Sequence, residues 1–244
     1  MKDRFSHDSA GYANFRPHYP ESVFKELFGL CVSFDAALDV ATGNGQVARH
    51  LARKFSQVKA TDISEQQIKN AYQASNLEYS IQPAEESSFV DHSFDLITVG
   101  QAVHWFDFNS FYAEVRRLLK PNGLLAILGY GLIQSEPSVE LIIGYFYSDI
   151  LGNYWDPERK WIDENYQTIP FPFKEVDFSN HTIAYSWNLE QLTGYLQTWS
   201  AVKNYKNQTG LDIMPQVTEE LKKAFGERKE VKVSFPILAR IGKV

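Results

Sequence analysis

Residues 35 to 130 alternate short apolar segments with longer amphipathic ones, and this alternation limits the possible folds more than any other feature. Five apolar segments predict strands: 36–40, 58–61, 77–81, 94–100 and 123–130. Between them, three amphipathic segments predict helices: 46–54, 65–75 and 109–119. Nearly continuous apolar strands that are separated by helices indicate a parallel sheet with both faces covered. We therefore expect an α/β fold.

The pattern changes after residue 130. Residues 131–172 are rich in aromatic side chains and show no strong strand alternation. Further on, two segments predict strands and two predict helices: 181–187 and 230–242, then 189–205 and 218–225. This order fits a helical insertion followed by strands that close the same sheet. We therefore expect a single domain over residues 1–244.

Charge and cysteine content argue against several classes of function. The net charge is −6, with acidic and basic side chains interspersed, so we expect no nucleic-acid partner. Cys31 is the only cysteine and the histidines lack metal-ligand spacing, so we expect no disulfide and no metal site. The polar N-terminus lacks a signal-peptide core, and the apolar run 123–133 is too short to span a bilayer. These features predict a cytoplasmic protein without a membrane partner.

The first predicted strand continues into a glycine-containing loop, LDVATGNGQVA at 38–48. Such a strand, loop and helix bring backbone N–H groups to a ligand, and Gly43 and Gly45 remove side chains from its path. The loop also fits the G-x-G-x-x-G/A pattern of dinucleotide-binding folds, with Asp62 placed for a ribose. By itself it fits a dinucleotide, another nucleoside ligand or a tight turn that binds nothing.

Asp39 helps to choose between these ligands. It lies four residues before Gly43, at the end of the predicted strand, and we expect its side chain in the same crevice. A carboxylate repels a pyrophosphate but attracts an ammonium or sulfonium group. Asp39 therefore favours a positively charged nucleoside ligand over NAD.

The segment DVATGNG at 39–45 resembles the first motif of the class I S-adenosyl-L-methionine (SAM)-dependent methyltransferases, with Ala41 in the first glycine slot. Four further segments resemble later motifs in the family order: ATDIS at 60–64, PAEESSF at 83–89, SFDLITVGQAVHWFD at 93–107 and RRLLKPNGLLAI at 116–127. The resemblance implies a Rossmann-like, mostly parallel, seven-stranded sheet with a helical insertion or lid. It also implies that Asp62 holds the ribose hydroxyls while Ala84 and Glu85 flank the adenine. Ser64 begins an S-x-x-Q capping box with Gln67, which would leave Asp62 for the ligand.

Three segments resemble a narrower group, the trans-aconitate methyltransferase-like members of the type-11 methyltransferases: YANFRPHYP at 12–20, QAVHWFD at 101–107 and LTGYLQTWSAVKNY at 192–205. In that group an N-terminal tyrosine and arginine close over the methionine end of the cofactor, and Tyr12 and Arg16 match them. An arginine can bind the cofactor carboxylate with two hydrogen bonds. The alternative for Arg16 is a surface ion pair.

The resemblance thus divides the domain into a cofactor-covering segment 1–34, a SAM-binding core 35–130, and a helical lid with closing strands 131–244. It implies a cofactor site made of Tyr12, Arg16, Asp39, Ala41, Gly43, Gly45, Gln46, Asp62, Ile63, Gln67, Ala84, Glu85, Gln101 and Ala102. It implies an acceptor site or lid made of His104, Trp105, Tyr130 and Trp199.

His104 is the candidate catalytic residue, as a general base or as a side chain that orders the turn after the fourth strand. Lys203 and Arg159 could steer an anionic substrate or simply face solvent, and the aromatic residues of 145–166 fit a lid or a core. We expect methyl transfer to a small-molecule acceptor, with a carboxylic acid favoured over a hydroxyl. The alternatives are an NAD(P)-dependent oxidoreductase and a non-catalytic SAM-binding protein. The acceptor and the oligomeric state do not follow from the sequence.

Overall fold

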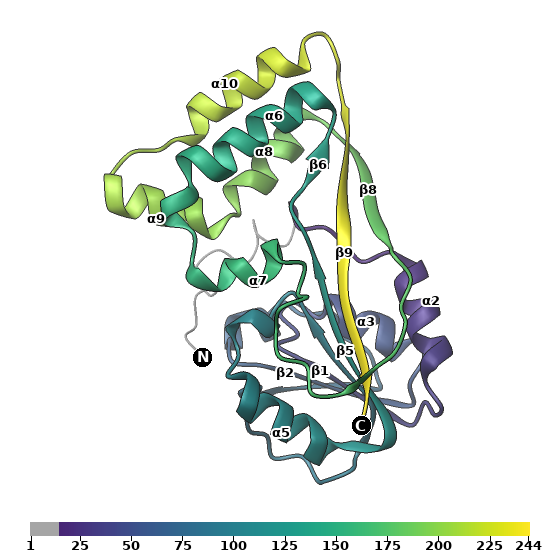
Figure 1. Ribbon diagram of the computed structural model, residues 1–244. Coiled ribbons are helices and arrows are strands. Elements are labelled where there is room, and N and C mark those ends of the chain that lie inside the picture. Colours follow the sequence, from purple (N-terminus) through teal and green to yellow (C-terminus); the bar gives the residue numbers. More distant parts are fainter. Residues whose placement is uncertain (1–14) are drawn as a thin grey trace.

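A computed structural model describes residues 15–244 and shows a sheet-containing core below a group of helices (Figure 1). Five strands lie parallel in the order β3, β2, β1, β4, β5. Their bounds are β1 (Ala36–Val40), β2 (Gln57–Asp62), β3 (Leu77–Ile81), β4 (Phe94–Gly100) and β5 (Leu119–Tyr130). Because β1 pairs with β2 on one side and β4 on the other, the strand order reverses at β1, where open α/β sheets bind ligands.

The long strand β9 (Val231–Lys243) pairs antiparallel with β5 and continues the sheet. On the same edge it then pairs with the two-residue strand β6 (Gln134–Ser135). Its other edge pairs with β8 (Thr182–Trp187) and the two-residue strand β7 (Lys174–Glu175), since Ser234 has partners on both sides. Across residues 15–244, the expected mostly parallel, seven-stranded sheet is confirmed, with β6 and β7 as short additions.

Helices cover both faces of the sheet because successive strand residues point to opposite sides. In β5, Leu124 and Ala126 pack into the apolar cluster that contains α2 (Glu21–Leu30) and α3 (Gln46–Ala52). Leu125 and Ile127 instead join α5 (Phe108–Leu118) in the cluster on the opposite face. The core is therefore a three-layer arrangement, with the carboxyl ends of the parallel strands left for a site.

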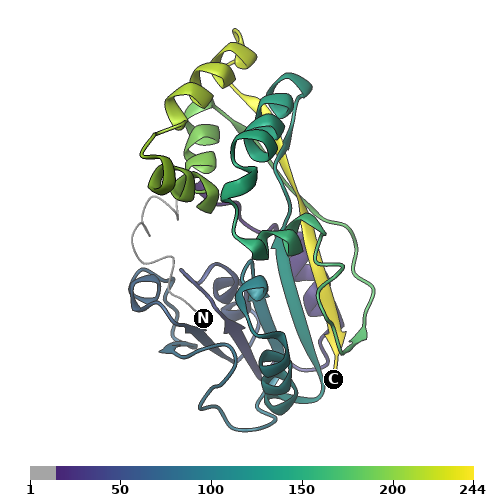
Figure 2. The ribbon, with the colours of Figure 1, turned by 60° about the vertical axis from the view of Figure 1, so that its left-hand side comes forward.

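Four helices, which we call the cap, lie beside the outer part of β9: α6 (Pro137–Tyr145), α8 (Leu189–Gln197), α9 (Ser200–Thr209) and α10 (Met214–Phe225). Figures 1 and 2 both show the cap at one end of the long β8–β9 ribbon. Between cap and core lies the connector, residues 146–169, with short turns and helix α7 (Lys160–Asp163). One apolar cluster runs from α2 and α3 into α6, α8 and α10, so cap and core share packing.

Two predicted helices end or break earlier than expected, and the helix expected over 218–225 begins earlier, at Met214. The helix expected over 65–75 is α4 (Glu65–Lys69), and the chain then turns so that Tyr72 N donates to the carbonyl of Asn44. The helix expected over 189–205 is broken at Trp199, which has an extended backbone and a buried side chain. Tertiary contacts decide the ends of both segments.

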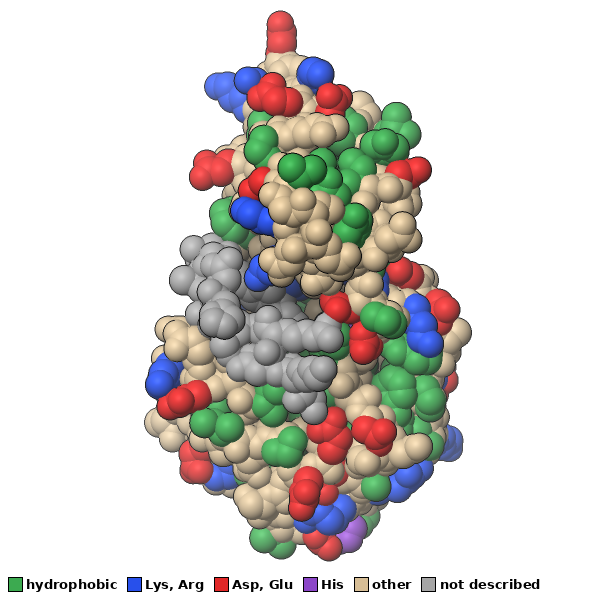
Figure 3. Space-filling view, turned by 90° about the vertical axis from the view of Figure 1, so that its left-hand side faces the viewer, with side chains coloured by type: hydrophobic (Ala, Val, Ile, Leu, Met, Phe, Trp, Pro, Cys, Tyr) green, Lys and Arg blue, Asp and Glu red, His purple; other side chains and the backbone are tan. Residues whose placement is uncertain are grey.

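The surface carries charges of both signs. On the face seen in Figure 3, acidic and basic side chains are interspersed over core and cap. Among residues 15–244, no helix is both long and apolar enough to cross a membrane. The same residues contain no group of three or more histidine, cysteine or acidic side chains placed to hold a metal ion.

Candidate functional site

A cleft lies at the carboxyl ends of the parallel strands, where the strand order reverses. We call it the strand-end cleft; including its open mouth, its volume is about 1030 Å³. Its walls are formed by Arg16, Pro17, Tyr19, Asp39, Ala41, Thr42, Gly43, Asn44, Gln46, Val47, Asp62, Ile63, Ser64, Gln67, Gly100, Gln101, Ala102, Trp105 and Tyr130. The loops after β1, β2 and β4 therefore supply most of the site.

The glycine loop after β1 has a left-handed backbone on one wall of this cleft. Gly43 has φ 56°, and a Cβ there would have Gln67 Oε1 as its nearest neighbour, 4.0 Å away, so the cleft in front of Gly43 is open. Gly45 has φ 80°, and its Cβ would collide with the hydroxyl of Tyr79. Gly43 thus leaves room for a ligand, whereas Gly45 is required for packing against β3 and does not line the cleft.

Two non-glycine residues on the wall also have positive φ, which is uncommon for side chains with a Cβ. Ala41 has φ 52° and Gln101 has φ 55°. The amide side chain of Gln101 bonds the backbone of Tyr130, accepting from its N–H at 2.8 Å, and so fixes the turn after β4. Strained backbone of this kind concentrates at ligand sites.

Asp39 is buried at the base of the cleft, and its carboxylate is held by three donors. Oδ2 accepts from Thr42 Oγ1 at 2.5 Å and from Ala48 N at 3.1 Å, and Oδ1 accepts from Thr98 Oγ1 at 2.7 Å. Burial raises the pKa of Asp39 to about 6, although these hydrogen bonds act in the opposite direction. Asp39 therefore ties the glycine loop to α3 and β4 as well as facing the cleft.

Asp62, at the end of β2, is anchored by two backbone amides. Oδ2 accepts from Gly43 N at 2.8 Å and Oδ1 from Ser64 N at 2.9 Å. Ser64 caps α4 by accepting from Gln67 N at 3.3 Å, as expected, but the amide of Ser64 bonds Asp62 instead of Gln67. Asp62 is thus not left free by this cap, and the two backbone amides orient its carboxylate at the cleft wall.

The structure brings ten of the expected cofactor residues to the cleft: Arg16, Asp39, Ala41, Gly43, Gln46, Asp62, Ile63, Gln67, Gln101 and Ala102. Tyr12 lies outside the described residues. Ala84 is buried in the core instead, and Glu85 accepts a hydrogen bond from Asp107 N at 3.2 Å. Most of the lining residues that the sequence interpretation missed are direct neighbours of predicted ones, such as Thr42 and Ser64. Tyr19 lies within the segment 12–20 that carried the narrower resemblance but was not singled out there.

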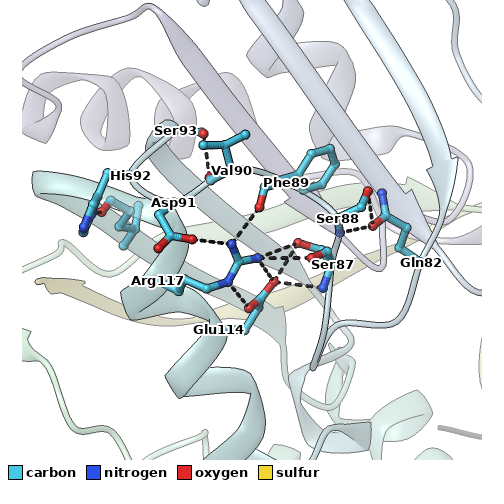
Figure 4. Close-up of polar contacts among 11 residues, drawn as sticks. Gln82, Ser87, Ser88, Phe89, Val90, Asp91, His92, Ser93, Glu114 and Arg117 are labelled. Atoms are coloured by element: carbon cyan, nitrogen blue, oxygen red, sulfur yellow. Dashed lines mark hydrogen bonds and ion pairs between the residues drawn. The ribbon is translucent and has the colours of Figure 1, made fainter.

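The loop that contains Ala84 and Glu85 is fixed by an ion-pair network on α5 (Figure 4). Arg117 donates to Glu114 Oε2 at 2.8 Å, to Asp91 Oδ1 at 2.7 Å and to the carbonyl of Phe89 at 2.7 Å. Glu114 also accepts from the backbone and hydroxyl of Ser87. Burial alone would raise the pKa of Glu114, but the bonds from Arg117 and Ser87 outweigh it and lower that pKa. Contacts within the chain therefore fix the position of this loop.

A second cavity adjoins the cleft, and we call it the cap cavity; including its open mouth, its volume is about 800 Å³. Core, connector and cap all contribute to its walls: Arg16, Gln101, His104, Trp105, Tyr130, Gly131, Trp155, Asp156, Arg159, Ile162, Tyr195, Thr198, Trp199, Ser200 and Lys203. The two cavities share Arg16, Gln101, Trp105 and Tyr130. Arg16 donates to the Tyr130 hydroxyl at 2.8 Å, at this junction. The four expected acceptor-site residues, His104, Trp105, Tyr130 and Trp199, all line the cap cavity.

Arg159 brings a positive charge to the cap cavity. Its guanidinium lies 4.7 Å from the ring centroid of Trp155 and 5.1 Å from that of Tyr147. Its Nε donates to the Tyr147 hydroxyl at 2.9 Å and to Asp163 at 3.2 Å. Since these bonds use Nε, the two terminal nitrogens keep the planar donor pair that suits a carboxylate.

His104 is buried in the short helix Val103–Trp105 after β4. Burial lowers its pKa to about 3, and the positive charges of Arg159 and Arg16 act in the same direction. Its Nδ1 lies 3.1 Å from the Tyr166 hydroxyl. A histidine with so low a pKa is neutral at pH 7 and is a weak general base there. The side-chain partner of His104 is thus a tyrosine of the connector.

Comparison with known proteins assigns this arrangement to a family. Residues 38–127 match the family described as methyltransferase domain, type 11. A Dictyostelium discoideum protein named as a methyltransferase is 34% identical over 99% of this chain and 95% of its own length. The chain is a class I SAM-dependent methyltransferase. The methyltransferase is therefore an enzyme with SAM as methyl donor, and the oxidoreductase alternative is wrong.

A solved structure and a second sequence relative agree with this assignment. A protein from Anaeromyxobacter dehalogenans described as a type II methyltransferase has a TM-score of 0.87 and 35% identity, covering 94% of this chain and 98% of the other. A Schizosaccharomyces pombe protein, also named as a methyltransferase, is 24% identical over 96% of this chain and 93% of its own length. These names specify no acceptor for the methyltransferase.

Proposed function

We propose that the methyltransferase transfers the methyl group of SAM to the carboxylate oxygen of a small acid bound in the cap cavity. The observation that carries this proposal is the Arg159 guanidinium in an aromatic-walled cavity that adjoins the strand-end cleft. The aromatic side chains suit an apolar body, and the guanidinium suits an anionic group. A similarity of three sequence segments to the trans-aconitate methyltransferase-like group supports the same acceptor class.

The strand-end cleft suits SAM in the chemistry of its walls. The open space at Gly43 and the carboxylate of Asp62 suit the ribose, whose two hydroxyls can donate to Asp62. The acidic side chain of Asp39 suits the ammonium group, and Arg16 at the junction suits the carboxylate. We assign Gln46, Ile63, Gln67, Gln101 and Ala102 to the same site because they line the cleft.

Three assignments rest on the family resemblance alone. Tyr12 would complete the methionine end, as part of a covering segment over 1–34. Ala84 and Glu85 would flank the adenine from the loop that Arg117 fixes. We treat residues 35–130 as the SAM-binding core and 131–244 as the lid and closing strands of one domain, because a shared apolar cluster joins them.

Bound SAM supplies an electrophilic methyl group, so transfer to a carboxylate forms one C–O bond, breaks one C–S bond and releases no proton. The chain then has to hold the acceptor in line and exclude water. Trp105 and Tyr130, which line both cavities, are placed to separate the two ligands except at the reacting atoms. Arg159, in the connector, orients the acceptor. A carboxylate needs no general base, so the low basicity of His104 does not limit the reaction.

The experiment is an acceptor screen with methyl-labelled SAM and four probes: benzoate, hexanoate, catechol and phenethylamine. We expect label in benzoate or hexanoate, released as methanol by mild alkali because the product is an ester. Arg159→Met should abolish most of this transfer, whereas the matched surface variant Arg53→Met should not. Transfer to catechol or phenethylamine, with none to either acid, would refute the proposed acceptor class.

A further inference from the structure

Two buried side chains from distant parts of the chain meet at the wall of the cap cavity. His104 follows β4 in the core, and Tyr166 follows α7 in the connector. Both are at most 6% exposed, and Nδ1 of His104 lies 3.1 Å from the Tyr166 hydroxyl oxygen. His104 also lines the cap cavity, whereas Tyr166 does not. The pair therefore reaches the cavity through the imidazole.

The direction of this hydrogen bond follows from the protons. Burial raises the pKa of Tyr166 above its ordinary range, so the hydroxyl keeps its proton. Within residues 15–244, His104 Nδ1 is the one acceptor to which that hydroxyl is hydrogen-bonded. Since a buried hydroxyl donates where an acceptor is present, Tyr166 donates and Nδ1 accepts. A neutral imidazole with an accepting Nδ1 carries its proton on Nε2.

Tyr166 is held rigidly enough to keep this arrangement. Its backbone has φ 59°, its N–H donates to the Trp161 carbonyl at 2.7 Å, and its carbonyl accepts from Arg240 Nη1 at 2.8 Å. The ring packs so tightly on β5 that a Cβ at Gly129 would lie 2.6 Å from ring atom Cε2. The hydroxyl therefore has little freedom to leave Nδ1.

We propose that Tyr166 is a positioning residue that makes His104 a hydrogen-bond donor, whose Nε2–H binds an oxygen of the methyl acceptor. The described charged groups that act on the imidazole are Arg159 and Arg16, and both oppose a positive charge on it. Because Nε2 already carries a proton, it cannot take one from a hydroxyl acceptor. His104 thus selects an oxygen that arrives deprotonated, an inference that rests on the proposed acceptor class.

The first test is the tautomer of His104, which needs no acceptor. In ¹⁵N-histidine-labelled protein, the His104 signals are those missing from His104→Asn. Long-range ¹H–¹⁵N spectra should show a protonated Nε2 and a hydrogen-bonded, unprotonated Nδ1 from about pH 5 to pH 8. Tyr166→Phe should remove the hydrogen-bond signature of Nδ1. Tyr112→Phe is the matched control, because the buried Tyr112 hydroxyl has no hydrogen-bond partner in the described part of the chain.

A protonated Nδ1, or a His104 that titrates near pH 6.5, would overturn the proposal. The second test adds benzoate to the complex with S-adenosylhomocysteine and follows the Nε2–H signal. We expect a shift with benzoate that is largely absent with benzyl alcohol and reduced in Tyr166→Phe. An unperturbed Nε2–H at saturating benzoate would also overturn the donor role. If His104 has the expected tautomer but neither acid is methylated in the acceptor screen, the result counts against the proposed function and not against the tautomer.

Discussion

The two adjoining cavities are built in different ways. The strand-end cleft is made by short loops after β1, β2 and β4, and backbone amides hold its carboxylates at Asp39 and Asp62. The cap cavity takes its walls from core, connector and cap, with aromatic rings and a guanidinium. The cleft is thus suited to one fixed ligand, whereas the cap cavity can change with the sequence of the connector and cap. The comparison predicts that substitutions of residues that line only one cavity leave binding in the other nearly unchanged.

The largest expected effect is on the cleft. Asp62→Ala removes both the proposed ribose contacts and the acceptor for Gly43 N, and charged hydrogen bonds contribute ~1.5–3 kcal/mol each. We expect SAM affinity, measured by calorimetry, to fall on the order of 100-fold. The exposed Asp177→Ala is the control. If Asp62→Ala folds and binds SAM with unchanged affinity, Asp62 only orders the turn and does not contact the ribose.

Arg159→Met tests the cap cavity. Loss of a charged hydrogen bond at a carboxylate should reduce kcat/KM for the acid acceptor roughly 30-fold. Arg159→Lys should recover only part of this loss because an ammonium lacks the planar donor pair. The affinity for SAM should stay within about twofold in both variants. An equal loss of SAM affinity would mean that the two cavities are not separate sites.

The pKa of Asp39 predicts a smaller, pH-dependent effect on the cleft. Its pKa is about 6 in the native protein, whereas the ordinary pKa of an aspartate carboxyl is 3.8. Because the native pKa is raised, the stabilisation from this group is complete below pH 3.8 and is lost as pH rises through about 6. An ammonium group beside Asp39 needs the ionised form, so SAM affinity should drop about tenfold from pH 7 to pH 5.

Calorimetric titrations across this pH range are the measurement. Asp39→Asn should bind SAM more weakly at pH 7 and with little pH dependence. If the SAM affinity of the wild-type protein is the same at pH 5 and pH 7, Asp39 does not contact the ammonium group.

The smallest expected effect is that of His104→Asn. If His104 is a donor, the asparagine amide can replace its hydrogen bond, and turnover should fall less than about fivefold. At saturating SAM, the turnover number kcat should be nearly independent of pH between about 5.5 and 8. A loss of roughly 10²–10⁴ in the asparagine variant, with a wild-type pH–rate limb near histidine's ordinary pKa, would indicate a general base.

The same contrast explains what the sequence could predict. Strand periodicity is local, so the parallel sheet followed from it. The spacing from Asp39 to Gly43 and Asp62 is local as well, whereas the other cleft residues followed from the family resemblance. Gly45 was expected to leave room for a ligand, but it leaves room for the hydroxyl of Tyr79, which lies on another strand. The donor pair of His104 and Tyr166 joins residues 62 positions apart and left no local pattern. Tertiary packing also set the break at Trp199.

Strand β9 has a consequence for how the molecule unfolds. Its inner half completes the core sheet through β5, and its outer half packs inside the cap through β8. Loss of β9 therefore removes packing from the core and from the cap at the same time. Neither the core nor the cap has a complete apolar core without it. Core and cap should melt together in one cooperative calorimetric transition, and hydrogen exchange at β9 should report the global free energy of unfolding.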